Sequence, residues 1–462
     1  MNTTRTETDS FGPIEIPADA LWGAQTARSL KFFAIGEQRM PLPIIHALAW
    51  VKWAAAQVNR ELGLLPVDRA QAITTAARRV VSGEFDTQFP LSVWQTGSGT
   101  QSHMNVNEVI AYLATQALGA GAQPVHPNDE VNLGQSSNDV FPSAMHVAAA
   151  WAMQNSLLPA LAHLRQALQA KATAFDGIVK IGRTHLQDAT PLTLKQEFGG
   201  YVAQLELCEA SLRQALPAVQ ALAIGGTAVG TGMNTHAEFG AQVAKRLAEE
   251  LKLPLRQADN LFAALAGHEP LVGLHGALKM LAIALTKIGN DIRLMGSGPR
   301  AGLGELQLPQ NEPGSSIMPG KVNPTQVEAL TMVAAQVIGH DAAITLAAAS
   351  GQFELNVYKP LIALNLLDSL RLLTDVMHSF AAHCVEGMQV NAARVGELMQ
   401  LSLMLVTALT PHIGYAAAAK IAKHAQAHDT TLRAAALMVG RLTPEQFDAW
   451  VDPKKMLGPS PG

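Results

Sequence analysis

The chain has 462 residues, of which 48% are hydrophobic and 15% are charged, and its formal net charge is −4. A balance so close to neutral offers no basic surface for nucleic acid and no polybasic patch for a membrane surface. The length predicts two or three domains with an ample hydrophobic core.

The charged share is low for a globular protein, in which about 25% of residues usually carry charge. Membrane-spanning helices or extensive burial between subunits would each explain it. The longest charge-free stretches are Leu398 to Ala419, which contains Pro411, and Gln214 to Ala237, which contains Gly225-Gly226. Neither is the run of about twenty apolar residues that a span needs. We therefore expect an oligomer that buries helices on several faces, with no membrane partner.

Cysteine content and the N-terminus indicate the compartment. Cys208 and Cys384 are the only cysteines, and they set neither a disulfide framework nor a metal-ligand spacing, which fits a reducing compartment. Met1 to Ser10 lacks the apolar core of a signal peptide. We expect a cytoplasmic protein.

Helical periodicity dominates the chain. Residues 1–135 hold shorter helices, of which Pro41 to Leu62 is the clearest. From Asn138 to Phe175 apolar residues recur at spacings of three and four, which predicts an element approaching about 55 Å in length. Further long helices are predicted over Pro191–Ala223, Glu269–Met295, Pro324–Ala349 and Pro360–Met388.

Helices of this length without β alternation predict an all-α fold with a central long-helix bundle. We expect an N-terminal mainly helical domain over residues 1–135, the bundle domain over 136–392, and a small C-terminal helical domain over 393–462. Pro142 fits the opening turn of its helix, whereas Pro159 predicts a kink. Thr190-Pro191 has the pattern of an N-cap followed by N1, which would open the helix after it.

The run from Gly314 to Pro324, GSSIMPGKVNP, is the most informative segment. It places two hydroxyls, a lysine and an amide in a loop punctuated by glycine and proline. Asn323, Pro324 and Gln326 are expected at the N-cap, N1 and N3 positions of the following helix. A lysine next to a helix N-terminus, where N–H groups are free and the dipole is positive, predicts a site for an anionic substrate.

Three other segments carry dense small polar residues: Thr96–Glu108, Gly134–Asp139 and Gly182–Pro191. Each alone is explained by helix capping. Together with the Ser315 segment they offer the donors that would hold a small dianion and stabilise charge that develops on it. The glycines of 225–232 match no nucleotide-binding pattern and are interpreted as a structural bend. The histidines form no HExxH motif or His/Cys cluster, and Ser315 is not in a GxSxG elbow.

These segments resemble class II fumarases, in the fumarase/aspartase superfamily, over nearly the full chain. GSSIMPGKVNP is the superfamily signature. The resemblance extends to four further segments: Trp22–Thr26, His126–Asp129, Gly351–Asn356 and Pro411–Tyr415.

The resemblance implies a three-domain, all-α subunit in a homotetramer whose active sites are each shared by three subunits. It also implies reversible hydration of fumarate to L-malate, a step of the tricarboxylic acid cycle, without cofactor or metal. Aspartases, which release ammonia from aspartate, carry Gln where this chain has His185 and Ala at the position of Gly320. An aspartate ammonia-lyase, another fumarate-releasing lyase and a non-enzymatic scaffold of the same fold are the alternatives.

Residue roles follow from the same resemblance. Ser315 corresponds to the base that removes the C3 proton, and Lys321 and Asn323 to groups that stabilise the resulting charge. His185 corresponds to the acid/base on the hydroxyl side and Glu328 to its orienting partner. Family positions that bind substrate are Ser98, Gly99, Thr100, Ser136, Ser137, Asn138, Thr184, Ser316 and Val322, and those of a secondary carboxylate site are His126, Pro127, Asn128 and Asp129.

Three positions depart from the family pattern. His103 stands where Asn is expected in the first polar segment, Leu133-Gly134 replaces a Lys-Ser pair, and Thr410 replaces an Asn. None removes a catalytic position, so the departures bear on fine specificity and leave the reaction class intact.

Overall fold

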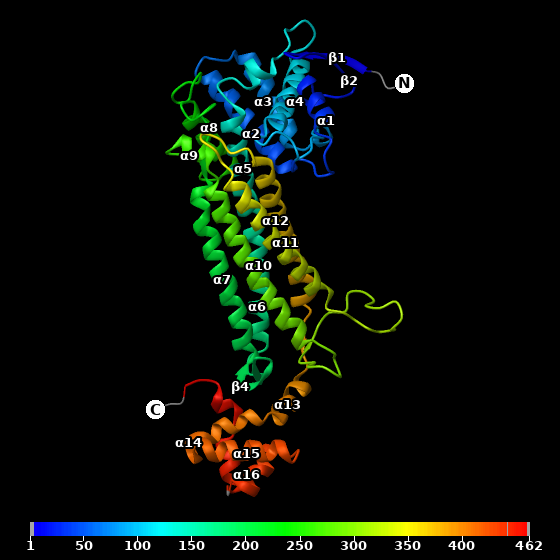
Figure 1. Ribbon diagram of the computed structural model, residues 1–462, viewed down its shortest axis with the longest axis vertical. Helices are drawn as coiled ribbons and strands as arrows, with labels where there is room; N and C mark the ends of the chain where they lie inside the picture. Colours follow the sequence, from blue (N-terminus) through cyan, green and yellow to red (C-terminus); the bar gives the residue numbers. More distant parts are fainter. Residues whose placement is uncertain (1–3, 441, 460–462) are drawn as a thin grey trace. The chain divides into compact units, whose positions relative to one another are not determined.

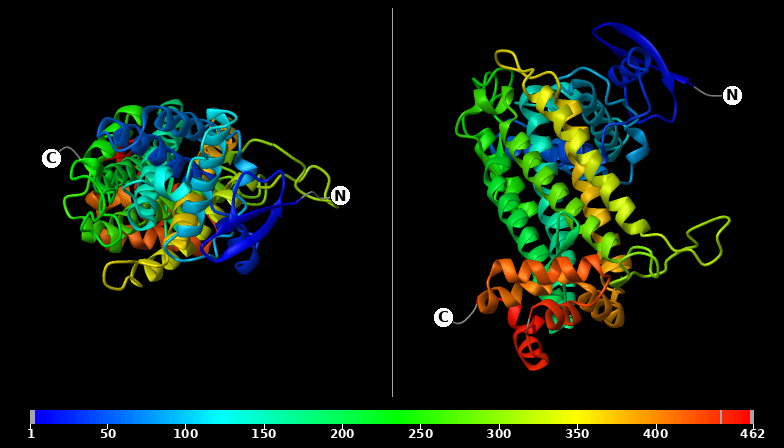
Figure 2. Two further views of the ribbon diagram at one scale, coloured as in Figure 1. Left: turned by 90° about the horizontal axis from the view of Figure 1, so that it is seen from above. Right: turned by 60° about the horizontal axis from the view of Figure 1, so that its bottom comes forward.

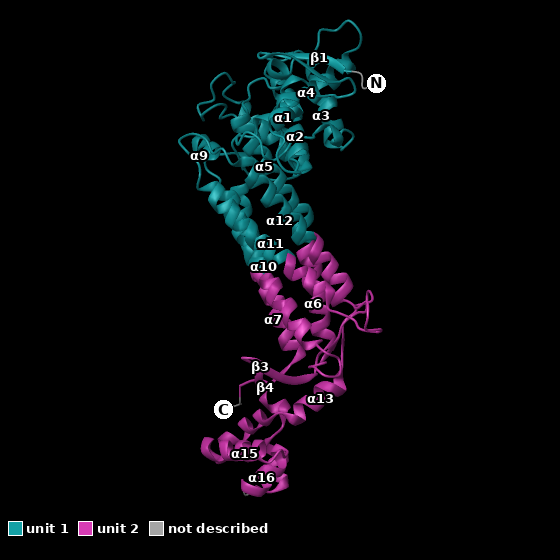
Figure 3. Ribbon diagram, turned by 45° about the vertical axis from the view of Figure 1, so that its right-hand side comes forward, with its two compact units in different colours: residues 1–159, 208–282, 333–374 teal, residues 160–207, 283–332, 375–462 magenta. Residues whose placement is uncertain are grey.

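The computed structural model describes residues 4–440 and 442–459. It is mainly helical and divides into two compact units, each assembled from separate stretches of chain (Figure 3). Unit 1 contains the chain up to Pro159 together with Cys208–Ala282 and Val333–Thr374, and unit 2 contains Ala160–Leu207, Ile283–Met332 and the chain from Asp375 on. The expected division at residues 135 and 392 stays a prediction.

The first part of unit 1 is a helical cluster preceded by an antiparallel hairpin, in which Thr4 pairs with Pro17. Most of α2 is buried on every side, as its apolar sequence requires. Lys52 is a lysine among these apolar residues, and its side chain is also fully buried. The elements here are β1 Thr4–Asp9, β2 Gly12–Pro17, α1 Ala24–Phe32, α2 Leu42–Glu61, α3 Val67–Val81, η1 Asp86–Gln88, α4 Thr100–Leu118 and η2 Pro127–Val131.

Long helices follow, and they pack side by side within each unit (Figures 1 and 2). In unit 1, His275 of α10 bonds to Asp341 of α11 and to Ser369 of α12. The all-α prediction is confirmed in its architecture. The helix predicted over Glu269–Met295 has these ends, whereas the one predicted over Pro360–Met388 ends at Phe380 and continues as η4. The elements are α5 Ser137–Ala152, η3 Met153–Leu157, α6 Leu158–Ala174, α7 Leu194–Val219, α8 Phe239–Leu251, α9 Leu261–Ala266, α10 Glu269–Met295, α11 Thr325–Ala348, α12 Lys359–Phe380 and η4 Ala381–Val385.

The irregularity expected at Pro159 lies one turn earlier. Residues Met153–Leu157 form a π-helical turn, in which the N–H of Leu158 donates to the carbonyl of Met153. Proline has no N–H for the carbonyl four residues before it, and its ring crowds that carbonyl. A π turn directly before the proline accommodates both effects.

The prediction that Thr190-Pro191 opens a helix is wrong. Both residues lie in β4 (Gln187–Thr193), which pairs antiparallel with β3 (Val179–Thr184). The helix begins at Leu194, where the N–H of Thr193 donates to Gln196 Oε1 at 2.9 Å and the N–H of Gln196 donates to Thr193 Oγ1 at 3.1 Å. Thr193 and Gln196 thus form the reciprocal capping pair, three residues beyond the predicted one.

The C-terminal part of unit 2 is a small helical cluster around Leu409, Ile421 and Ala435 (Figure 2, orange to red). Its elements are α13 Ala392–Leu401, η5 Leu403–Leu409, α14 Thr410–Ile413, α15 Tyr415–Ala427, α16 Leu432–Val439, α17 Pro444–Trp450 and η6 Pro453–Met456. The remaining strands make two short pairs, and they are β5 Ala221–Leu222, β6 Arg256–Gln257, β7 Leu306–Gln307 and β8 Gln389–Val390.

Two helices, α10 and α11, are long and apolar enough to cross a membrane by length and composition alone, and the bent pair Ala392–Leu401 and Leu403–Ile413 would be a third candidate. Neither helix is one of the charge-free stretches considered as membrane spans above, because both contain ionisable residues. Lys279 of α10 donates to Asp341 of α11 at 2.5 Å, so the two helices share an ion pair inside unit 1.

Candidate active site

Residues 308–324, here called the Ser315 loop, form neither helix nor strand (Figure 1, yellow-green). The N–H of Gly314 donates to the Lys321 carbonyl at 2.8 Å, and Asn323 Nδ2 donates to the Gly314 carbonyl at 2.7 Å. A Cβ on Gly314 would lie 2.6 Å from the Lys321 carbonyl oxygen, so the closure requires glycine. The two ends of the signature motif are therefore tied together.

Ser315 lies inside this closed loop. Its Oγ accepts the N–H of Ile317 at 3.3 Å and the N–H of Met318 at 3.0 Å. Hydrogen bonds donated to an oxygen favour its negatively charged form, so both contacts lower the cost of deprotonating the hydroxyl. Ser315 is half-buried, whereas Ser316 and Lys321 are exposed.

The capping role expected for Asn323 is wrong. Helix α11 begins at Thr325, and the N–H groups of Val327 and Glu328 donate to the Pro324 carbonyl. Because the Asn323 side chain is used to hold Gly314, it does not cap the helix. Gln326 Oε1 accepts from Ser379 Oγ at 2.8 Å instead of closing a capping box.

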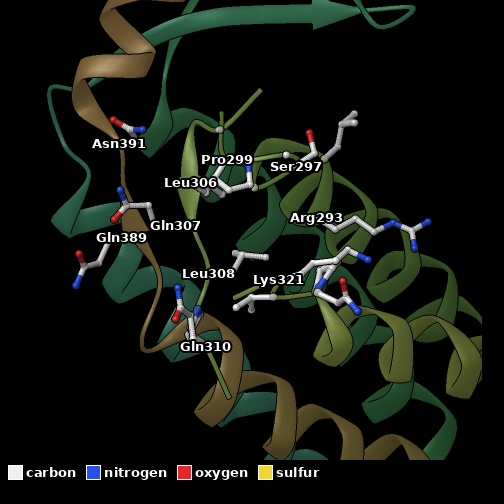
Figure 4. A pocket seen from close by; sticks show the side chains of 18 of the residues that line it. Arg293, Ser297, Pro299, Leu306, Gln307, Leu308, Gln310, Lys321, Gln389 and Asn391 are labelled. Atoms are coloured by element: carbon white, nitrogen blue, oxygen red, sulfur yellow. The ribbon is translucent and has the colours of Figure 1, made fainter. Parts of the chain in front are cut away.

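A pocket of about 1410 Å³ lies against the end of the Ser315 loop in unit 2. Lys321, Val322 and Asn323 line it, together with Arg293 and Arg300. Figure 4 shows Lys321 and Arg293 among the lining side chains. Three cationic side chains around one cavity suit an anionic ligand.

Thr184 and His185 lie at the exposed tip of the β3–β4 hairpin, also in unit 2. Thr184 pairs with Gln187, and His185 and Leu186 between them have φ of 56° and 59°. Two central residues with positive φ are typical of a type I′ turn. The turn presents the imidazole to solvent.

Strand β3 of this hairpin is anchored by ion pairs. Arg183 donates through both terminal nitrogens to the fully buried Glu305, each at 3.0 Å. Buried Lys180 lies 2.9 Å from Glu197 and 3.5 Å from Glu305. The sequence analysis missed this network, because Arg183 and Glu305 are far apart in the sequence and neither belongs to a signature motif.

The first polar segment lies in unit 1, where Gly99 is the N-cap residue of α4. Gly99 has φ of 79°, and a Cβ there would lie 2.3 Å from Phe141 of α5. Ser98 Oγ and Thr100 Oγ1 are 2.9 Å apart. The close approach of Gly99 to α5 brings these hydroxyls next to the start of that helix.

The second polar segment caps α5, as its position before the helix led us to expect. Ser136 Oγ accepts the Asn138 N–H at 3.2 Å, and the Ser136 N–H donates to Asp139 Oδ1 at 2.9 Å. Buried Asp139 also accepts the N–H groups of Gly225 and Thr227. Burial raises the pKa of Asp139 to about 6. The glycine-rich bend therefore uses its amides to hold a carboxylate of the protein.

In the segment His126–Asp129, His126 caps η2 and the other three residues form its first part. His126 Nδ1 accepts the Asp129 N–H at 3.1 Å, and it lies 3.1 Å from Asp129 Oδ2. Asn128 Nδ2 contacts Met104 Sδ at 3.9 Å. The geometry is that of a closed turn with a histidine and a carboxylate on its surface.

The expected site residues fall into two groups. The residues of 98–100 and 136–138, with the turn 126–129, belong to unit 1, whereas the residues of 184–185, 315–316 and 321–328 belong to unit 2. Among the described residues, no hydrogen bond joins the side chains of His185 and Glu328.

Comparison with known proteins decides the family. A family model described as Lyase matches residues 12–339, and one described as Fumarase C C-terminus matches residues 405–458. The chain is 64% identical to the class II fumarate hydratase of Chromobacterium violaceum, covering 98% of this chain and 99% of that one. Identity to the class II fumarate hydratase of Ralstonia nicotianae is 60%, covering 99% of this chain and 100% of that one.

The chain belongs to the class II fumarase family. Its fold agrees, because the crystal structure of the class II fumarase from Schistosoma mansoni superposes with a TM-score of 0.96 at 45% identity, covering 98% of this chain and 99% of that chain.

Proposed function

We propose that this chain is a hydro-lyase that reversibly hydrates fumarate to L-malate in the tricarboxylic acid cycle. Its class II fumarate hydratase relatives, at about 60% identity over nearly their whole length, support this activity. The single structural observation that carries it is the Ser315 hydroxyl, which accepts two backbone N–H groups in the loop that also holds Lys321.

In the dehydration direction, the Ser315 oxygen removes a proton from C3 of L-malate. This proton is weakly acidic, because the electrons left behind place a further charge on the adjacent carboxylate. Lys321 and the free N–H of the Asn323 amide stabilise that charge. Such donors each contribute about 2.7–4 kcal/mol to the transition state in other enzymes.

The hydroxide lost from C2 combines with a proton and leaves as water, which completes the elimination. His185 supplies acid/base chemistry on this side, for which an imidazole is suited near neutral pH. Glu328 orients His185. Substrate carboxylates are held by donors from both groups of residues, namely Ser98, Gly99, Thr100, Ser136, Ser137, Asn138, Thr184, Ser316 and Val322.

The active form is proposed to be a homotetramer in which three subunits contribute to each site. One support is the surface of α11, where Met332, Ala335, Gly339, Ala342 and Leu346 are all exposed. Their spacing alternates between three and four residues, which is the pattern of a helix seam that packs against another helix. Copies of the chain packed on this seam would bury it and bring the two groups of site residues together.

Three further features belong to the same proposal. The turn His126, Pro127, Asn128 and Asp129 is a secondary carboxylate site, and catalysis needs neither cofactor nor metal. The enzyme is cytoplasmic, which the two free, buried cysteines support.

The rival activity is elimination of ammonia from L-aspartate, against which His185 and Gly320 argue. We would follow the ultraviolet absorbance of the fumarate double bond after adding L-malate, with L-aspartate in a parallel cuvette. We expect the absorbance to rise with malate alone. A rise with aspartate would make the chain an ammonia-lyase. An unchanged absorbance with both substrates would indicate another fumarate-releasing substrate or a scaffold.

A further inference from the structure

Lys52 of α2 is a fully buried lysine that no step of the proposed reaction uses. Its Nζ lies 2.9 Å from Asn132 Oδ1, 2.9 Å from Gln135 Oε1 and 2.5 Å from His103 Nε2. An ammonium group has three N–H donors and no acceptor. Burial lowers the pKa of Lys52 well below its ordinary value, whereas the Asp139 carboxylate favours the charged form. As an ammonium, Lys52 donates one N–H to each of the three surrounding acceptors.

The two amide side chains are oriented by their other contacts. Asn132 Nδ2 donates to the Gln135 carbonyl at 3.2 Å, and Gln135 Nε2 donates to the carbonyls of Val131 and Leu133, each at 3.2 Å. Their nitrogens are thus engaged with backbone oxygens, so their oxygens face Lys52. Lys52 is the donor in both contacts, which leaves its third N–H for His103.

His103 of α4 is also fully buried. Burial, followed by the proximity of Lys52, holds the pKa of His103 well below its ordinary value, so the ring is neutral. A neutral imidazole that accepts at Nε2 carries its proton on Nδ1. His103 Nδ1 lies 2.7 Å from Ser137 Oγ, so its N–H donates to that hydroxyl.

Ser137 is the first residue of α5 and is half-buried. A hydroxyl that accepts a hydrogen bond from His103 keeps its own proton free to point away from the ring. A carboxylate can only accept hydrogen bonds, so it requires a donor of this kind.

We propose that Lys52 and His103 form a buried hydrogen-bonded chain that fixes the Ser137 hydroxyl as a donor to a substrate carboxylate. Lys52 and His103 are positioning residues, since both act through Ser137. The inference rests on the proposed function, in which Ser137 binds the substrate. It also gives a role to His103, one of the three departures from the family pattern.

The test compares two variants of nearly equal shape, His103→Asn and His103→Asp, by their KM and kcat for L-malate. The Asn amide retains an N–H for Ser137, whereas the Asp carboxylate accepts only and would turn the Ser137 proton inward. Loss of a hydrogen bond to a charged group weakens binding by about 10- to 100-fold. We expect KM to be at least about tenfold higher in His103→Asp than in His103→Asn, with kcat changed much less.

The Ser137→Ala variant separates this mechanism from repulsion by the new Asp charge. Because His103 acts through Ser137, we expect the double variant His103→Asp/Ser137→Ala to have the KM of Ser137→Ala alone. Additive effects, equal KM values for the Asn and Asp variants, or an unchanged KM in Ser137→Ala would each overturn the inference.

Two controls distinguish failure of this inference from misfolding and from failure of the proposed function. If His103→Asp does not fold, His103→Leu, which also lacks a donor, replaces it in the same comparison. The wild-type enzyme is assayed first with malate and aspartate. Its inactivity with both would reject the proposed function, whereas full activity with no difference between variants would reject only the role of His103.

Discussion

At the scale of single residues, the Ser315 hydroxyl has the environment that a serine base requires. Serine is a weak base unless nearby donors or charges favour its alkoxide. The N–H groups of Ile317 and Met318 supply two such donors, and Lys321 of the same loop adds positive charge nearby. The geometry of the loop depends on Gly314 and Asn323, which close it.

We predict that Ser315→Ala and His185→Asn each lower kcat by about 10²–10⁴-fold, because each removes a proton-transfer group. Steady-state assays with L-malate and with fumarate measure the change. Far-ultraviolet circular dichroism and the elution volume should match the wild type, since His185 is exposed and Ser315 lies half-buried in a loop outside the helices and strands. A Ser315→Ala enzyme with a near-normal rate would contradict the assignment of Ser315 as the base.

At the scale of elements, the substrate loops are held by places where backbones come unusually close. The loop before α4 is the clearest case, because a Cβ on Gly97 would lie 1.4 Å from the Val357 carbonyl oxygen. The Gly97 carbonyl also accepts the N–H of Lys359 at 3.0 Å. Ser98 is therefore positioned by the segment before α12, which lies far from it in the sequence.

We predict that Gly97→Ala lowers the free energy of unfolding by about 1–3 kcal/mol or more, because the backbone must move to admit the methyl group. The same movement would displace Ser98 and raise KM. Thermal unfolding followed by circular dichroism, together with KM for L-malate, measures both effects.

Gly396→Ala is the matched control. Gly396 lies within α13, and a Cβ there would meet no atom within 4 Å. Alanine is preferred to glycine inside a helix by about 0.5–1 kcal/mol, so this variant should unfold at an equal or higher temperature. Equal destabilisation of both variants would show that the Gly97 contact is not the cause.

At the scale of the whole molecule, the low charge content and the apolar helices point to burial between subunits. Only 28% of the most apolar stretch of α11 is buried within the single chain. Its exposed seam consists of apolar residues spaced for helix packing, and Leu346 is 72% exposed.

If the proposed tetramer packs on this seam, Leu346→Glu converts it into smaller species and abolishes activity, because a buried unpaired carboxylate would lie in the seam. Sedimentation velocity measures the assembly, and the malate assay measures the activity. Leu401→Glu, at a 66% exposed position of α13, should leave both unchanged. A tetramer that persists in Leu346→Glu would place the subunit contacts elsewhere.

Residue order alone was sufficient for several conclusions about the fold. Helix periodicity located α2, α5, α10, α11 and α12, because amphipathic spacing is a local property of the chain. The signature motif and its companion segments predicted the family, which the comparisons confirm. The residue roles within the site stay predictions.

Other features required the folded chain, because they depend on contacts between residues distant in sequence. Thr190-Pro191 has a local helix-start pattern, yet pairing with β3 places both residues in a strand. Asn323 has a good capping side chain, yet the Gly314 carbonyl engages it. Lys52 is separated from Ser137 by 85 positions, and only packing of α2, α4 and α5 joins them through His103. Capping and periodicity act over a few residues, whereas hydrogen-bond partners are chosen by tertiary packing.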